Sequence, residues 1–140
     1  IYREWFVDFE FPDENGKPYK SNGGEMVWNE ELQKEIPKGW EVKELKHVID
    51  NFDSKRKPIS GSDRQGKEKI YPYYGAAALM DYIDEYIFDG EYILLGEDGS
   101  VVTEIGTPVL QYVWGKFWVN NHAHVLKGKM VLMKIAFICY

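Results

Sequence analysis

The stretch IYPYYGAAALMDYIDEYIFDGEYILLGEDGS, residues Ile70–Ser100, sets the fold of the chain. Its tyrosine, isoleucine and phenylalanine side chains favour the pleated, half-buried environment of β-strands. Phe88-Asp89-Gly90 and Glu97-Asp98-Gly99 have the composition of turns, so the stretch is not one long helix. The pattern predicts three elements: a strand over Tyr71–Gly75, a turn or small helix over Ala76–Tyr82, and a strand over Glu91–Leu95.

More strands are expected on the C-terminal side of this stretch. The segment VLQYVWGKFWV, Val109–Val119, alternates on both sides of Gly115-Lys116, which predicts a hairpin with a two-residue turn. A third strand is predicted at His122–Leu126. In such a hairpin Trp114 and Trp118 favour the core, and the alternative for both is stacking on an extruded base.

The N-terminal part mixes helical patterns with breakers. Apolar residues at helical spacing predict a helix over Ile1–Phe11, followed by a loop over Pro12–Gly24. Asn29 can cap a short helix through Lys34, because Asn side chains accept from the first free backbone N–H groups. After the break at Pro37, a helix is predicted over Glu41–Asn51.

Together these elements predict an α/β fold of the α+β type, with a twisted, mostly antiparallel sheet and short helices. The length allows one domain with a real core, and no run is apolar for long enough to span a membrane. The single cysteine, Cys139, excludes an internal disulfide and fits the cytoplasm. The chain begins at Ile1 rather than Met and ends in the apolar run Met130–Tyr140, whose structural type stays open, so a fragment of a longer protein is expected.

Charge is unevenly distributed along the chain. The net charge is −6, but residues 51–75 carry +3 and residues 111–140 carry +4, whereas residues 76–110 carry −8. DNA binding requires a local positive patch rather than a high pI. The candidate DNA contacts are the cations of the basic segment and of the predicted hairpin turn: Lys55, Arg56, Lys57, Arg64, Lys67, Lys69 and Lys116. The alternative for the basic segment is a solvated loop.

Several blocks occur in an order that identifies a family. The sequence contains YPYYGA from Tyr71, DYID from Asp81, FDGEYIL from Phe88, EDG from Glu97 and NNHAHVL from Asn120. This series resembles the target recognition domain of type I restriction enzyme specificity subunits over nearly the whole chain. The positions that carry the resemblance include Tyr73, Tyr74, Gly75, Asp89, Gly90, Glu97, Asp98, Gly99, Asn120, Asn121, His122 and His124.

The resemblance implies a non-catalytic module that reads one half of a bipartite site in double-stranded DNA. It also implies methylation and restriction subunits as partners, no cofactor and no metal. Residues 1–11 would be the end of a conserved spacer helix, residues 12–36 a linker, and residues 37–140 a recognition domain that is incomplete at its C-terminus. Arginines in the basic segment could read a guanine edge, and lysines could position the DNA backbone.

Enzymatic and other functions are the alternatives. Pro12-Asp13 with Glu41-Val42-Lys43 matches the PD…ExK pattern of metal-dependent nucleases, although Asp13 lies in a predicted loop. His122 and His124 could share a zinc site, or could be hydrogen-bonded histidines without a metal. The sequence has no P-loop, no GxGxxG and no methyltransferase Asn-Pro-Pro-Tyr motif. A protein-interaction domain using the acidic residues 76–110 is a further hypothesis.

Overall fold

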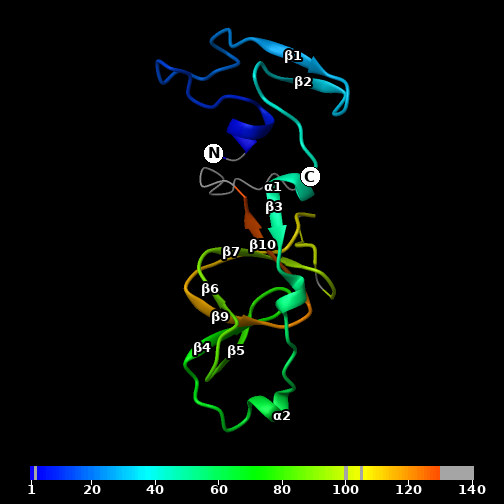
Figure 1. Cartoon of the computed structure of the whole chain (residues 1–140). Helices are drawn as coiled ribbons and strands as arrows, with labels where there is room; N and C mark the ends of the chain where they lie inside the picture. The colour runs from blue at the N-terminus through cyan, green and yellow to red at the C-terminus, as the bar shows by residue number, and fades with distance from the viewer. Residues whose placement is uncertain (2, 100, 105, 130–140) are drawn as a thin grey trace. The chain divides into compact units, whose positions relative to one another are not determined.

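A computed structural model describes residues 1, 3–99, 101–104 and 106–129 of the chain (Figure 1). These residues form two compact units, residues 1–44 and residues 45–129. The segment Met130–Tyr140, whose type the sequence left open, lies outside the described residues. Among the described residues, no helix has the length and apolar character needed to cross a membrane.

The first unit is held together by aromatic rings. Its helix η1 (Arg3–Val7) is a single π-helical segment, so the helix predicted over Ile1–Phe11 forms only in part. Phe9, with a left-handed φ of 60°, redirects the chain after the helix. The ring of Trp40 then packs edge-on against Phe9, with centroids 5.6 Å apart, and stacks on Phe11 at 5.4 Å.

A β-hairpin replaces the helix predicted from Asn29 to Lys34. Strand β1 (Met26–Asn29) pairs antiparallel with β2 (Lys34–Pro37). The Asn29 side chain does cap, but it accepts from the backbone N–H of Leu32 (2.9 Å) within the connecting turn. The prediction was wrong because an Asn side chain can stabilise a tight turn by the same bond that starts a helix.

The second unit contains two four-stranded sheets. The first has the strand order β3-β10-β7-β8 and is entirely antiparallel. Its strands are β3 (Ile49–Asn51), β10 (Ala123–Gly128), β7 (Tyr92–Gly96) and β8 (Leu110–Val113). The predicted strands over Glu91–Leu95 and His122–Leu126 are therefore confirmed as β7 and β10.

The helix predicted over Glu41–Asn51 is largely wrong. Only α1 (Leu45–Val48) is helical, and the chain then becomes strand β3. Leu45, Val48 and Ile49 do have helical spacing, but residues Ile49–Asn51 pair with Gly128–Leu126 of β10 instead. Tertiary strand pairing therefore overrides the local helical pattern.

The second sheet has the order β5-β4-β9-β6. Its strands are β5 (Leu79–Ile83), β4 (Tyr71–Tyr74), β9 (Lys116–Val119) and β6 (Phe88–Asp89). The strand predicted at Tyr71–Gly75 is confirmed, whereas most of the predicted turn or helix at Ala76–Tyr82 is strand β5. The pair β4–β9 is parallel and the other described pairs are antiparallel, which confirms the α+β class with mostly antiparallel sheets.

The predicted hairpin over Val109–Val119 does not form, because its two strands belong to different sheets. β8 pairs with β7, whereas β9 pairs with β4 and β6. The turn at Gly115, with a φ of 77° that suits glycine, carries the chain from one sheet to the other. Trp118 is buried as predicted, but Trp114 at this corner is 70% exposed, so its predicted core position is wrong.

The main core of the second unit uses side chains from both sheets. One face of each sheet contributes apolar side chains, and the largest are aromatic. The cluster comprises Phe88, Tyr92, Leu94, Val113, Phe117, Val119, Ala123 and Val125. Its rings pack closely: Phe88 stacks on Phe117 with centroids 5.3 Å apart. This core makes the two sheets a firm platform for the loops that leave their edges.

Candidate nucleic-acid interface

The basic segment predicted to contact DNA connects β3 to β4. It includes the 3₁₀ helix η2 (Asp53–Lys55) and the one-turn helix α2 (Gly61–Arg64), which is capped by Ser60 accepting from the N–H of Asp63 (3.1 Å). We distinguish a proximal segment, residues 52–58, from a distal segment, residues 59–69. The charged side chains of the two segments have different partners.

In the proximal segment, Arg56 turns inward. Its guanidinium bonds the carboxylate of Glu97, donates to the carbonyl of Ala123 (2.9 Å) and lies 3.5 Å from Asp53 Oδ2. The Arg56 side chain is only 13% exposed. A guanidinium held by these acceptors fixes the loop against β10 and the end of β7.

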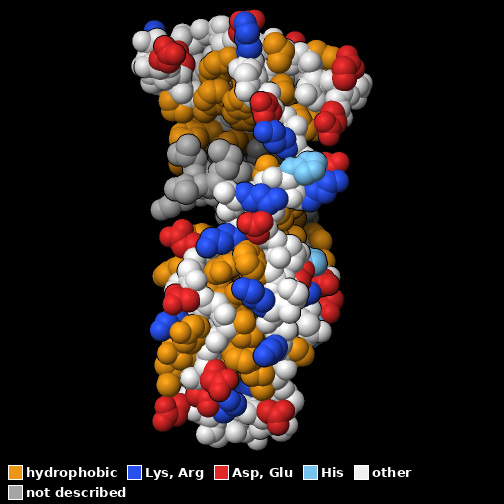
Figure 2. Space-filling view, in the orientation of Figure 1, with side chains coloured by type: hydrophobic (Ala, Val, Ile, Leu, Met, Phe, Trp, Pro, Cys, Tyr) orange, Lys and Arg blue, Asp and Glu red, His pale blue; other side chains and the backbone are white. Residues whose placement is uncertain are grey.

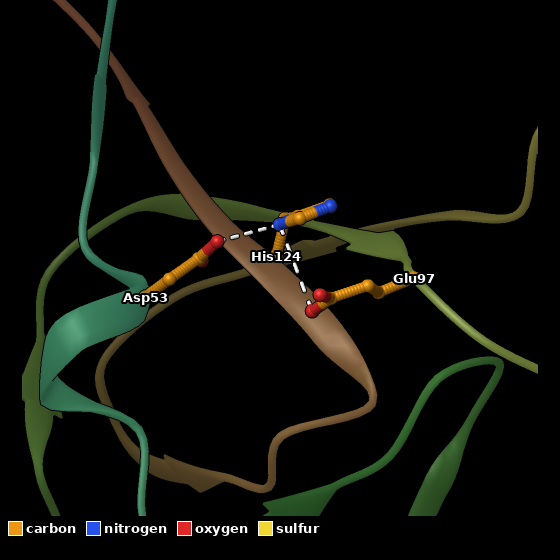
Figure 3. A group of neighbouring side chains, drawn as sticks. All are labelled: Asp53, Glu97 and His124. Carbon is orange, nitrogen blue, oxygen red and sulfur yellow. Dashed lines mark hydrogen bonds and ion pairs between the residues drawn. The ribbon is translucent and has the colours of Figure 1, made fainter.

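Asp53 and His124 complete this charged group (Figure 3). Asp53 Oδ1 accepts from the backbone N–H of Val125 (2.8 Å), and Oδ2 lies 2.5 Å from His124 Nδ1. His124 Nδ1 is also 3.8 Å from a Glu97 carboxylate oxygen. Figure 3 shows the three side chains converging from η2, from the residue after β7 and from β10. The group therefore joins three segments that are distant in sequence.

The environment of Asp53 favours its ionised form. Burial by itself raises the pKa of this carboxyl, but hydrogen bonds from His124, Val125 and Asn51, together with the charge of Arg56, outweigh it. The net result is a pKa below the usual value for aspartate. The Asp53 carboxyl is therefore ionised at neutral pH, and its negative charge is part of the network.

The same group is the one set of side chains, within the described part of the chain, whose donors could hold a metal ion. One ligand atom each from Asp53, Glu97 and His124 lies within 4.8 Å of the others. Imidazole and carboxylate ligands suit zinc or a similar divalent metal. However, Arg56 already contacts both carboxylates, so a metal would have to displace this guanidinium.

The two histidines of the signature block are hydrogen-bonded to carboxylates, as one of the two interpretations predicted. His124 bonds Asp53, and His122 Nδ1 lies 2.7 Å from Asp98 Oδ1. The two rings therefore have different partners. Asp53 could not be predicted as a partner of His124, because it lies in a basic segment that is distant in sequence from the histidines.

In the distal segment, cations pair with carboxylates of strand β5. Arg64 Nε lies 3.1 Å from Asp81 Oδ2, and Lys69 Nζ lies 3.1 Å from Asp81 Oδ1. The Arg64 guanidinium also sits over the ring of buried Tyr73, 4.7 Å from its centroid. A backbone hydrogen bond from Tyr82, followed by the bond from Lys69, lowers the pKa of Asp81.

The pair Lys67–Asp84 extends this pattern, with Nζ 2.6 Å from Oδ1. Asp81 and Asp84 were not predicted as partners of the basic segment, although the distribution of charge along the chain signals them. Residues 76–110 carry −8 and follow the +3 of residues 51–75, so that opposite charges are adjacent in the chain. In the fold, the pairs of Arg56, Arg64, Lys67 and Lys69 with Glu97, Asp81 and Asp84 neutralise part of these charges.

Four of the predicted cations are exposed, namely Lys55, Lys57, Lys69 and Lys116, and of these Lys69 pairs with Asp81. Lys55 Nζ lies 5.3 Å from the ring centroid of Phe52, and Lys116 Nζ lies 4.6 Å from that of Tyr86. Within the described residues, none of the other three ammonium groups has a carboxylate at ion-pair distance. The visible face of the second unit in Figure 2 shows basic and acidic side chains interspersed, without a broad positive patch.

The signature positions around β4 and β9 make structural contacts. The hydroxyl of Tyr73 accepts from the N–H of Ile59 (3.1 Å), and buried Asn120 accepts from the N–H of His122 (2.8 Å). The N–H of Asn120 donates to the carbonyl of Tyr74 (3.1 Å). A Cβ at Gly75 would lie 2.3 Å from the sulfur of Met80, so this exposed, flexible side chain would have to shift to admit one.

The other signature positions lie in turns and strand ends. Asp89 of β6 is opposite Lys116 of β9, and Gly90 and Gly99 adopt left-handed φ values of 133° and 74°. The carbonyl of Asn121 accepts from Arg56 Nη1 (3.4 Å). These contacts shape the platform and its loops.

The residues of the possible nuclease pattern are used locally. The Asp13 carboxylate accepts from the backbone N–H groups of Asn15 (2.8 Å) and Lys17 (2.9 Å), and these bonds stabilise a turn. Hydrogen bonding, first of all from Lys17, lowers the pKa of Asp13. Glu41 pairs with Lys43 at 2.5 Å. Neither carboxylate belongs to a metal-binding group among the described residues.

Comparison with known proteins identifies the class to which this platform and its loops belong. Residues 37–140 match the family described as "Type I restriction modification DNA specificity domain". The chain belongs to this family, as its sequence blocks predicted.

Named relatives agree with this assignment. The chain is 39% identical over 106 residues to the putative type I restriction enzyme specificity subunit S.HindORF215P of Haemophilus influenzae, covering 74% of this chain and 26% of the relative. It is 28% identical over 159 residues to the type I restriction enzyme MjaIX specificity subunit of Methanocaldococcus jannaschii, covering 99% and 32%. The chain thus spans about a quarter to a third of these relatives. No solved structure matches.

Proposed function

We propose that this chain reads one half of a bipartite target site in double-stranded DNA. The observation that carries the proposal is membership of the DNA specificity family over residues 37–140. The architecture supports it, because a firm two-sheet platform presents irregular loops with exposed lysines. Loops that vary on a rigid scaffold are the usual carriers of specificity.

The domain acts without catalysing a reaction, as part of a larger assembly in the cytoplasm. Two relatives are named as specificity subunits of type I restriction enzymes, and methylation and restriction subunits are the expected partners. In this assembly the domain selects the DNA site, and separate subunits modify or cleave it. No observed feature favours a stand-alone nuclease, a methyltransferase or a general protein-interaction domain.

A segment exchange in a complete type I system tests the proposal. Residues 37–140, with their natural continuation, are replaced by the matching segment of a family member with another target, and methylated bases are mapped across the genome. We expect one half of the methylated bipartite motif to change while the other half and the spacing stay the same.

Exchange of residues 1–36 alone is the matched control and should leave both half-sites unchanged. Methylation at the original motif after exchange of residues 37–140 would contradict the proposal, because the segment would then be a scaffold or a protein contact. A new spacing with unchanged half-sites would assign it to the spacer instead.

A further inference from the structure

We propose that Lys55 and Lys57 anchor the domain to DNA phosphates, and that Arg56 between them is a positioning residue that does not contact DNA. This inference rests on the proposed function and concerns how the same domain holds its DNA. It separates three adjacent cations that composition alone treats as equivalent.

The first step is the direction of the side chains. Arg56 is 13% exposed and points toward Glu97 and the Ala123 carbonyl, whereas Lys55 and Lys57 are both exposed. An arginine whose guanidinium is held by two carboxylates and a carbonyl cannot reach a base without breaking those bonds. Its neighbours can reach phosphates without any such loss.

The second step is the rigidity of the backbone that carries the lysines. The N–H of Phe52 donates to the Val125 carbonyl (2.8 Å), so the segment is tied to β10 at its start. At its end, the indole Nε1 of buried Trp118 donates to the Lys57 carbonyl (2.6 Å). Both lysines therefore project from a loop that is already ordered, which lowers the entropy cost of binding.

The third step is the charge left over after intramolecular pairing. Arg64, Lys67 and Lys69 have carboxylate partners, and a DNA phosphate would have to compete with these. Within the described residues, the ammonium groups of Lys55 and Lys57 have no carboxylate at ion-pair distance. Lysine acts on a phosphate as a simple point charge, which suits backbone anchoring rather than base reading.

The test is DNA binding by the full-length specificity protein in complex with its partner subunits. Affinity for a target duplex and for a scrambled duplex is measured over a series of salt concentrations. For the double variant Lys55→Ala/Lys57→Ala, we expect the slope of log K against log salt to fall by about 1.8, since each lost phosphate contact removes about 0.9. Affinity should fall by a similar factor on both duplexes.

Matched variants make this result specific. Lys127→Ala removes an exposed lysine of β10 in the same unit and should leave the slope unchanged. Two results would contradict phosphate anchoring by Lys55 and Lys57. One is an unchanged slope in the double variant. The other is a reduction of the slope in Lys127→Ala as large as the reduction per lysine in the double variant. If the unmodified complex shows no preference for the target duplex, the proposed function itself fails.

A double-mutant cycle tests the role of Arg56. Arg56→Lys keeps the charge but not the guanidinium fork, so we expect it to weaken binding in the parent protein and to add no further loss in the Lys55→Ala/Lys57→Ala background. A direct DNA contact, or a general destabilisation, would reduce affinity equally in both backgrounds and would overturn the positioning role. Thermal unfolding of each variant shows that it is folded at the assay temperature.

Discussion

The proximal and distal halves of the basic segment have similar composition but different architecture. In the proximal half, residues 52–58, one arginine is sequestered by Asp53 and Glu97, and the lysines on both sides are exposed. In the distal half, residues 59–69, Arg64 and Lys69 pair with Asp81 of β5, and Lys67 pairs with Asp84, the residue that follows β5. Cations that are adjacent in the sequence are therefore paired or left unpaired according to the fold around them.

The two halves also differ in the burial of their ion pairs. Arg56 and Asp53 have side chains that are 13% and 19% exposed, whereas Lys69 is 47% and Asp81 is 30% exposed. Interactions between ions strengthen as water is excluded, but the loss of one partner then becomes more costly. The proximal network should therefore matter more for stability, and variants of both halves can test this order.

The largest effect is expected from Arg56→Ala. This change leaves the carboxylates of Asp53 and Glu97 without their cation and removes a donor from the Ala123 carbonyl. We expect the free energy of unfolding to fall by about 2–3 kcal/mol, measured by urea denaturation. A loss below about 0.5 kcal/mol, the range of ordinary surface substitutions, would show that the network contributes little.

A smaller and pH-dependent effect is expected from Asp53→Asn. The pKa of Asp53 is lower in the folded state than in the unfolded state, so its carboxylate stabilises the fold. This stabilisation is complete above the unfolded-state pKa of about 3.9, and it is lost as the pH falls through the folded-state pKa. The difference in unfolding free energy between parent and variant should thus shrink below about pH 4. A difference that stays constant from pH 7 to pH 3 would contradict this assignment.

Arg64→Ala should have a moderate effect through its contact with Tyr73. Loss of the guanidinium over this buried ring is expected to cost about 1 kcal/mol. Arg64→Lys is the matched variant, because it keeps a cation near Asp81 but loses the planar stacking. Equal unfolding free energies for Arg64→Ala and the parent would show that the contact with Tyr73 is energetically neutral.

Local sequence patterns predicted some of the strands but not the partners with which strands pair. Periodicity identified β4, β7 and β10 because their residues are apolar or aromatic and lie between turn signals. It failed at Ile49–Asn51 and between Val109 and Val119, where pairing with distant strands decides the outcome. No local pattern encodes which sheet a strand joins.

The basic segment could be located from the sequence, but the partners of its cations could not. Composition placed the basic segment, and the ordered signature blocks identified the family, because both are properties of the sequence alone. Which cations are free depends on Asp53, Asp81, Asp84 and Glu97, and these carboxylates meet the basic segment only in the folded chain. Adjacent blocks of opposite charge were the available signal for this pairing.

The smallest effect is expected from Lys67→Ala, in the distal half. The bond to Asp84 raises the pKa of Lys67 and lowers that of Asp84, yet both side chains remain in contact with solvent. Salt screens such a pair, so any change in melting temperature should shrink further as sodium chloride is added. Melting curves of Lys67→Ala and Arg56→Ala at low and high salt compare the halves directly. If Lys67→Ala lowers the melting temperature as much as Arg56→Ala does, and salt does not reduce this effect, the distinction between the two halves fails. The distal ion pairs would then contribute as much to stability as the proximal network.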